Sequence, residues 1–162
     1  MTYDPLAAVA ALSGHGVRYV VIGGVAAVSQ GSPIVTTDLD VCYDRSRDNL
    51  ERLAAALREL HAHPRGAPDG LPLRLDADTL AAGDCFTFAT DAGPLDVFGT
   101  LAGARGYDDL RSRAVAVDLG GFSVLAAAVD DLIAMKQASG RPKDATHVMH
   151  LEALRDELAA GD

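Results

Sequence analysis

Tryptophan is absent from the 162-residue sequence, aromatic residues make up only 5% of it, and there are two cysteines, Cys42 and Cys85. Two isolated cysteines cannot form the disulfide framework of a small secreted domain, and the sequence has no Cys-x-x-Cys pair or Cys/His spacing typical of structural zinc. Both cysteines lie in segments that we expect to be strands. We therefore interpret them as reduced residues of the core.

Long apolar runs are also missing, because no stretch approaches the roughly 18 residues that a membrane-spanning helix needs. Residues 1–12 contain Asp4 but no basic residue, which is unlike a signal peptide. These features predict a cytoplasmic location and no membrane partner. With 49% apolar and 23% charged residues, the chain fits one globular domain spanning residues 1–162.

Positive charge is scarce, and it is unevenly distributed. The formal net charge of −9 argues against a protein that coats nucleic acid, since phosphate contacts need a basic surface. Beside twelve arginines there are only two lysines, Lys136 and Lys143, and both fall within one eight-residue stretch. A compact, mobile ammonium is not equivalent to a planar guanidinium. The clustering indicates a local basic patch, although two residues can also cluster by chance.

Hydrophobic periodicity and turn residues predict helices at about 5–12, 25–30, 47–60, 129–139 and 144–159. The same criteria predict strands at 18–22, 38–43, 85–90, 95–98, 115–118 and 122–125. Residues 61–75 are rich in proline and glycine, which indicates a loop with a short edge strand at its end. The fold class expected is α/β (α+β), a small mixed β-sheet flanked by helices. Its core would span about 17–126, with a helical C-terminal part at about 129–160.

The most informative segment is an apolar strand that carries two aspartates, Asp38 and Asp40. Residues i and i+2 of a strand point to the same face, so the two side chains project together with Cβ atoms roughly 7 Å apart. Two ionised carboxylates at this separation repel each other, and a divalent cation removes the repulsion. Mg²⁺ combines one or two carboxylates with water and phosphate oxygens. The spacing therefore favours a metal–nucleotide site, although an exposed strand at a sheet edge would also tolerate both acids.

A glycine pair, Gly23-Gly24, lies between an expected strand and the start of a helix. Without side chains, backbone N–H groups can approach a phosphate closely at such a point. The pair matches neither the dinucleotide pattern G-x-G-x-x-G nor the Walker pattern, which needs Gly-Lys-Ser/Thr. A simple turn is the alternative interpretation.

The order of these motifs resembles the nucleotidyltransferase (polymerase β-like) superfamily. In both, a strand and a Gly-Gly pair precede a short helix and a Thr-x-Asp-Leu-Asp segment, here residues 36–40. That superfamily has a third carboxylate on a later strand, which Asp96 matches. The stretch 131–144, with Arg-Pro-Lys-Asp at its end, is similar to small bacterial members such as the AbiEii-type toxins of toxin–antitoxin systems. The resemblance covers roughly residues 17–155.

The resemblance implies a nucleotidyltransferase fold and an enzyme that moves a nucleoside monophosphate from a nucleoside triphosphate to a hydroxyl group. It implies that Asp38, Asp40 and Asp96 are catalytic and bind Mg²⁺ or Mn²⁺. The implied nucleotide-binding residues are Gly23, Gly24, Ser32, Thr36, Lys136, Arg141 and Lys143. The acceptor would be a tRNA, a protein or a small molecule, and a toxin of this type would have an antitoxin protein as its partner.

One position departs from the pattern. Many relatives carry an arginine in an Arg-x-Thr-x-Asp-x-Asp arrangement, and this chain has Ile34 there, so one phosphate contact is missing. A catalytically silent module that binds a nucleotide or a partner is therefore a second hypothesis, and a structural domain with incidental acids is a third. The cations at 136–143 could simply complement a helix C-terminus, and Ser32 and Thr36 could belong to an ordinary polar loop.

Overall fold

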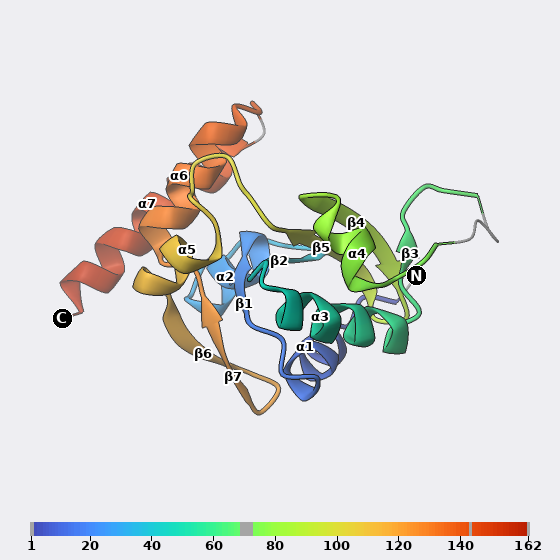
Figure 1. Ribbon diagram of the computed structural model, residues 1–162. Coiled ribbons are helices and arrows are strands. Elements are labelled where there is room, and N and C mark those ends of the chain that lie inside the picture. Colours follow the sequence, from blue (N-terminus) through green and yellow to red (C-terminus); the bar gives the residue numbers. More distant parts are fainter. Residues whose placement is uncertain (1, 69–72, 143, 162) are drawn as a thin grey trace.

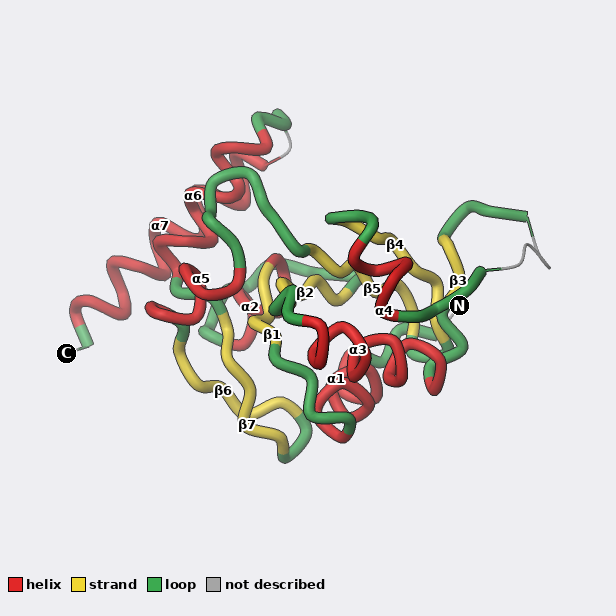
Figure 2. The backbone as a smooth tube through the Cα atoms, in the orientation of Figure 1, coloured by secondary structure: helices red, strands yellow, loops and turns green. Residues whose placement is uncertain are grey.

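The computed structural model describes residues 2–68, 73–142 and 144–161. Seven strands within these ranges form one mixed β-sheet with the order β3-β4-β5-β2-β1-β7-β6. The strands are β1 (Tyr19–Ile22), β2 (Leu39–Tyr43), β3 (His63–Pro64), β4 (Cys85–Thr90), β5 (Gly93–Phe98), β6 (Val115–Leu119) and β7 (Phe122–Ala126). Figure 2 shows the strands in yellow with the helices around them. The expected mixed α/β class is confirmed.

The sheet combines local hairpins with long-range parallel pairs. β4 pairs with β5 and β6 pairs with β7 in antiparallel hairpins. Gly93, Gly120 and Gly121 have positive φ angles, which glycine adopts without the steric penalty of a side chain. In the centre, β2 lies between β1, antiparallel to it, and β5, parallel to it. Strand β2 is thereby placed between segments that are distant in the sequence.

The helices are α1 (Pro5–Gly14), α2 (Gly23–Ser29), α3 (Arg47–Glu59), α4 (Ala77–Ala81), α5 (Tyr107–Arg113), α6 (Val129–Ser139) and α7 (Asp144–Ala160). Figure 1 shows α1 close to α3, whereas α6 and α7 lie together at the end of the molecule away from β3. In the described residues, no helix combines the length and the apolar character that crossing a bilayer requires.

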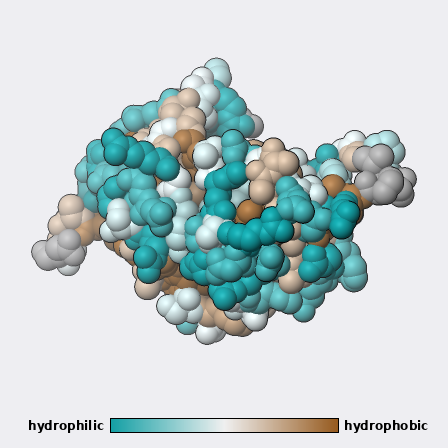
Figure 3. All heavy atoms as spheres, in the orientation of Figure 1, coloured by the Kyte–Doolittle hydropathy of each residue, from teal (hydrophilic) through white to brown (hydrophobic). Residues whose placement is uncertain are grey.

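Helix α3 shows how the sequence directs each element to its place. Leu50, Leu53 and Leu57 recur at helical spacing and are all buried. The polar residues between them belong to the largely hydrophilic surface seen over α3 in Figure 3. The predicted start of α1 is also confirmed, because the Asp4 carboxylate accepts a hydrogen bond from the backbone N–H of Ala7 at 3.1 Å. Burial of one apolar face thus positions α3, and a hydrogen bond to Asp4 marks the start of α1.

Several expectations about local structure were wrong. Cys42 is buried as expected, but Cys85 is exposed, and the neighbouring strand β3 pairs only with Phe88 and Ala89 at the other end of β4. The short edge strand lies at the start of the proline-rich stretch, as β3, and residues 73–75 form no strand. The intervening residues 69–72 lie outside the described ranges. Helices α4 and α5 were not predicted, since each has only five to seven residues and too few turns for a clear period.

Asn49 ties three elements together from inside the protein. Its side chain is fully buried, accepts a hydrogen bond from Arg18 N at 2.7 Å, and donates to the carbonyl oxygens of Arg18 and Asp44. Substituting Asn49→Ala would leave Arg18 N and the Asp44 carbonyl oxygen without this partner, at roughly 1–3 kcal/mol for each group, whereas the Arg18 carbonyl oxygen would keep its hydrogen bond from Asp44 N. We expect urea denaturation to show a free energy of unfolding lower by about 3 kcal/mol. Arg52→Ala, an exposed change on the same helix, is the control, and equal losses in both variants would contradict this role.

Candidate active site

The three aspartates singled out in the sequence meet on one face of the sheet. Asp40 in β2 and Asp96 in β5 are direct partners in the parallel pair of strands, and Asp38 precedes β2 by one residue. One carboxylate oxygen from each of the three residues lies within 4.8 Å of the others. The sequence separated these acids by 58 residues, and the β2–β5 pairing removes that separation. The predicted convergence is confirmed.

The acid cluster is electrostatically unfavourable on its own. Burial, together with the neighbouring charges of Asp38 and Asp96, raises the pKa of Asp40 to about 7, and Lys136 opposes the shift. Burial also raises the pKa of Asp96, although Arg65 acts in the opposite direction. The three carboxylates repel one another when ionised, and a bound cation would relieve that repulsion. Hard oxygen donors in this arrangement fit a divalent cation such as Mg²⁺ or Mn²⁺.

The glycine pair lets the backbone approach these acids. A Cβ atom added to Gly23 would lie 2.4 Å from Asp40 Oδ2, and one added to Gly24 would lie 2.6 Å from Thr36 Oγ1. Gly23 also has a φ of +65°, which residues other than glycine rarely adopt. Both glycines begin α2, so they belong to the helix instead of forming a separate turn. The need for space beside the acids is a physical reason for glycine at both positions.

A cationic group lies beside the acids at the junction of α6 and α7. Lys136 Nζ lies 3.4 Å from Asp144 Oδ1, and Arg141 Nε donates to Asp144 Oδ2 at 3.1 Å. Asp144 is buried, and its hydrogen bond from Ser139, together with Lys136 and Arg141, lowers its pKa to about 2. A firmly ionised Asp144 therefore holds both cations in place. Lys143, the other lysine predicted for this patch, lies outside the described residues.

The remaining predicted residues occupy the loop that leads into β2. Thr36 lines a cavity beside the acids and donates a hydrogen bond to the carbonyl oxygen of Asp38 at 3.1 Å. Ile34 borders the same cavity. Ser32 is buried and accepts a hydrogen bond from Ile34 N at 3.4 Å. Ser32 is not among the residues that line either cavity described below, so the structure does not bring it to the acids as it does Thr36.

Arg65 contacts the acid cluster, and sequence reasoning missed it. Its Nη2 donates to Asp96 Oδ1 at 2.7 Å, and its Nη1 donates to the Phe88 carbonyl oxygen at 3.3 Å. Its backbone N–H donates to Thr87 O at 3.0 Å, which fixes the loop after β3 against β4. Arg65 therefore orients the Asp96 carboxylate. Nothing in the proline- and glycine-rich sequence around residue 65 indicates this contact, because it depends on how β3 pairs with β4.

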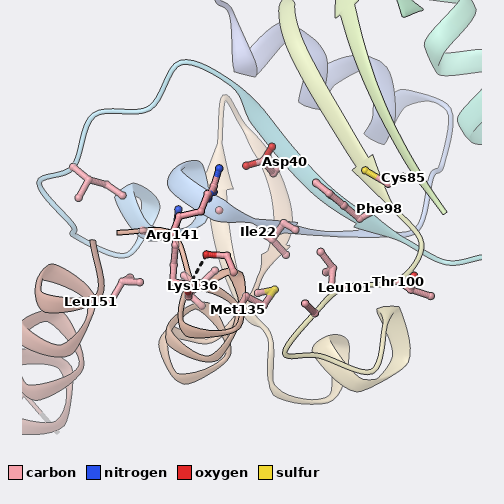
Figure 4. A pocket seen from close by; sticks show the side chains of 16 residues that line it. Ile22, Asp40, Cys85, Phe98, Thr100, Leu101, Met135, Lys136, Arg141 and Leu151 are labelled. Atoms are coloured by element: carbon pink, nitrogen blue, oxygen red, sulfur yellow. Dashed lines mark hydrogen bonds between the residues drawn. The ribbon is translucent and has the colours of Figure 1, made fainter. Parts of the chain in front are cut away.

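Two adjoining cavities flank Asp40. A polar cavity of about 290 Å³ is lined by Gly24, Thr36, Asp38, Lys136, Arg141 and Asp144, among others. A larger cavity of about 420 Å³ is mainly apolar. Figure 4 shows it between Asp40, Cys85 and Phe98 on the sheet side and Leu101 and Met135 on the other side. Asp40, Ile34, Lys136 and Arg141 line both cavities. The acid cluster thus lies where a charged compartment meets an apolar one.

Solved structures of other proteins share this architecture. A Thermotoga maritima protein that bears a provisional nucleotidyltransferase name matches with a TM-score of 0.54 at 15% identity, over 94% of this chain and 89% of that one. The antibiotic-resistance factor ANT(2″)-Ia, whose conformational dynamics are regulated by its substrate, matches with a TM-score of 0.55 at 14% identity, over 95% and 88%. The chain has a nucleotidyltransferase fold. No family model and no curated protein matches the sequence.

Proposed function

We propose that this protein is a metal-dependent nucleotidyltransferase of the polymerase β-like superfamily. It would move a nucleoside monophosphate from a nucleoside triphosphate to a hydroxyl acceptor and release pyrophosphate. The observation that carries the proposal is the convergence of Asp38, Asp40 and Asp96 within 4.8 Å. An isolated cluster of this kind is unfavourable, and a bound cation makes it stable.

In this proposal Asp38, Asp40 and Asp96 hold Mg²⁺ or Mn²⁺, which when bound neutralises phosphate charge and orients the reacting oxygens. The polar cavity, with Thr36, Lys136 and Arg141, accommodates the triphosphate by charge complementarity. Gly23 and Gly24 leave room for phosphate oxygens beside the backbone, and Ser32 shapes the loop that closes this side. The same charge argument applies to Lys143 as to its neighbour Arg141.

Asp96 differs from the other two acids because it is bonded to Arg65. This pairing keeps its carboxylate in one orientation, from which it would accept the proton of the attacking hydroxyl group. The transferred phosphorus is then attacked while pyrophosphate leaves on the side of Lys136 and Arg141. Positioning and electrostatic stabilisation supply most of the rate in such reactions.

The candidate acceptors come from the resemblance of the sequence to the superfamily and not from the geometry of the site. A tRNA, a protein hydroxyl and a small molecule all fit a reaction at a hydroxyl group, and the two structural neighbours leave this choice open.

We also propose, from the similarity of residues 131–144 to AbiEii-type toxins, that the enzyme acts in the cytoplasm as the toxin of a toxin–antitoxin pair. Co-expression with the protein of the adjacent gene, followed by co-purification, tests the antitoxin partner.

Incubation with each nucleoside triphosphate labelled at the α-phosphate, Mg²⁺ and cell extract tests the reaction. We expect the wild-type protein to label an extract component, and Asp38→Asn or EDTA to reduce labelling by at least about 100-fold, as loss of a group that stabilises transition-state charge does. Asp118→Asn, near the end of β6, is the matched control that retains labelling. Equal labelling by the wild-type protein and Asp38→Asn would exclude transfer at this site.

A catalytically silent nucleotide-binding module remains the second candidate, and Ile34 favours it. Ile34 borders both cavities where relatives often have arginine, so triphosphate binding rests on Lys136 and Arg141. Calorimetry separates the two candidates. A silent module would bind Mg²⁺ and a triphosphate without labelling any acceptor, and Ile34→Arg would then strengthen triphosphate binding without restoring transfer.

A further inference from the structure

The larger cavity beside Asp40 is not explained by phosphate binding. It is lined chiefly by apolar side chains, among them Phe98, Leu101, Leu132 and Met135, and Figure 4 shows Phe98, Leu101 and Met135 around it. A triphosphate carries about four negative charges at neutral pH and would lose its hydration there without compensation. The cations that could compensate, Lys136 and Arg141, lie at the border with the polar cavity. The apolar cavity therefore needs a different occupant.

The position of the two cavities relative to Asp40 decides which part of a substrate enters each. If the proposed function holds, the α-phosphate lies at the acid cluster, with the β- and γ-phosphates beside Lys136 and Arg141 in the polar cavity. The nucleoside is bonded to the α-phosphate and must lie in space that adjoins the acid cluster outside the polar cavity, and the apolar cavity, which Asp40 also lines, provides such space. Its volume of about 420 Å³ is in the range of small-ligand sites.

We propose that the apolar cavity binds the nucleoside half of the substrate and holds the base by burial against Phe98, Leu101, Leu132 and Met135. This inference rests on the proposed function and deepens it, because it states how the base is recognised. Burying a flat base between apolar side chains contributes affinity roughly in proportion to the area removed from water. The site thus distinguishes a nucleotide from a bare triphosphate.

The cavity offers few groups that could distinguish one base from another. Asp40, Lys136 and Arg141 are shared with the polar cavity, and the Ser139 hydroxyl is bonded to Asp144. In the part of the lining that the structure describes, Thr100 and Cys85 are the other polar side chains. A site without dedicated hydrogen-bond partners discriminates weakly among bases, whereas a hydrogen-bonding site rejects the wrong ligand strongly. All four nucleoside triphosphates should therefore be bound with similar affinity.

Cys85 provides a direct report on occupancy of this cavity. It lines the apolar cavity and is exposed, whereas the other cysteine of the sequence, Cys42, is fully buried. A maleimide should therefore modify Cys85 first. A nucleoside in the cavity would cover the thiol, and a bare triphosphate in the polar cavity would leave it accessible. Loss of the label in Cys85→Ala checks the site of modification.

The experiment compares calorimetric binding of ATP, GTP, CTP, UTP and inorganic tripolyphosphate, each with Mg²⁺, and repeats the maleimide reaction with each ligand. We expect the four nucleotides to bind within about 5-fold of one another and roughly 10- to 100-fold more tightly than tripolyphosphate, from the buried area of the base. Each nucleotide should slow Cys85 labelling, and tripolyphosphate should not. Met135→Ala should weaken nucleotide binding several-fold and leave tripolyphosphate binding unchanged.

The possible failures are distinguishable. If tripolyphosphate binds as tightly as ATP and Cys85 stays reactive with both, the triphosphate site stands and the nucleoside site is wrong. A preference of more than about 100-fold for one base would overturn recognition by burial alone, since it requires specific hydrogen bonds. If neither ATP nor tripolyphosphate binds, the proposed function itself fails. If nucleotides bound to Met135→Ala with unchanged affinity and still protected Cys85, the base would not lie against Met135 in this cavity.

Discussion

Asp40→Asn should make the protein more stable at pH 8 in the absence of divalent cations, while abolishing nucleotidyl transfer. Burial and the neighbouring acids raise the pKa of Asp40 from 3.8 to about 7. The folded protein therefore retains a proton that the unfolded chain releases over this range. Such a group contributes stability that is present below about pH 4 and is lost as the pH rises through 7. An amide is neutral at every pH and avoids this loss.

The size of the effect follows from the pKa shift. Each unit corresponds to about 1.4 kcal/mol, and burial in a real site relaxes part of it, so we expect a stabilisation of roughly 2–4 kcal/mol at pH 8 and little difference near pH 4. Transfer should fall by about 1000-fold or more, because a group that we propose to hold the cation is lost. Stability and function would then oppose each other at one carboxyl group.

Chemical denaturation of both proteins in EDTA at pH 4.5, 6 and 8 measures this effect, and the difference between them cancels groups that titrate in both. Mg²⁺ should stabilise the wild-type protein at pH 8 and leave Asp40→Asn unchanged. Asp118→Asn, with the same change of charge near the end of β6, should show neither effect. A variant that is less stable than the wild-type protein at pH 8 would show that Asp40 is not held in an unfavourable environment.

The acid cluster could be predicted from the sequence because its pattern is local and unusual. Two aspartates two residues apart in an apolar strand must share a face, whatever surrounds them. Asp96 was predicted through the resemblance, and its place opposite Asp40 depends on the parallel pairing of β2 with β5. No rule of spacing gives that pairing across 56 residues. The fold class could be predicted for a similar reason, since strands and amphipathic helices each have a characteristic hydrophobic period in the sequence.

Arg65 and Cys85 show where such reasoning ends. Arg65 reaches Asp96 because β3, a strand of two residues, pairs with β4, and so short a strand has no period to recognise. Cys85 looked like a core residue because it begins an apolar strand, but burial depends on what covers each position and not on the strand alone. The apolar cavity is likewise formed by β5, α6 and the loop at residues 100–102, which only the tertiary structure brings together.

Gly23→Ala should disable the site although no functional group is removed. The new Cβ would lie 2.4 Å from Asp40 Oδ2 and 3.2 Å from its Cγ, distances at which one of the two residues must move. Asp40 is confined between Asp96 and the α2 backbone, so we expect its carboxylate to turn away from the other two acids. Transfer should fall by roughly 100-fold, as it does when positioning is lost by about 1 Å. Stabilisation by Mg²⁺, measured by thermal unfolding, should fall with it.

Gly140→Ala separates this effect from backbone strain. Gly140 has the same φ of +65°, but a Cβ there would meet nothing within 4 Å. Both alanine variants should therefore lose about 1–2 kcal/mol of stability from the left-handed backbone conformation. Only Gly23→Ala should also lose its response to Mg²⁺, because only there does the methyl group reach a carboxylate of the cluster. If both variants kept that response, the glycine would serve the helix start alone and the acids would not depend on the space it leaves.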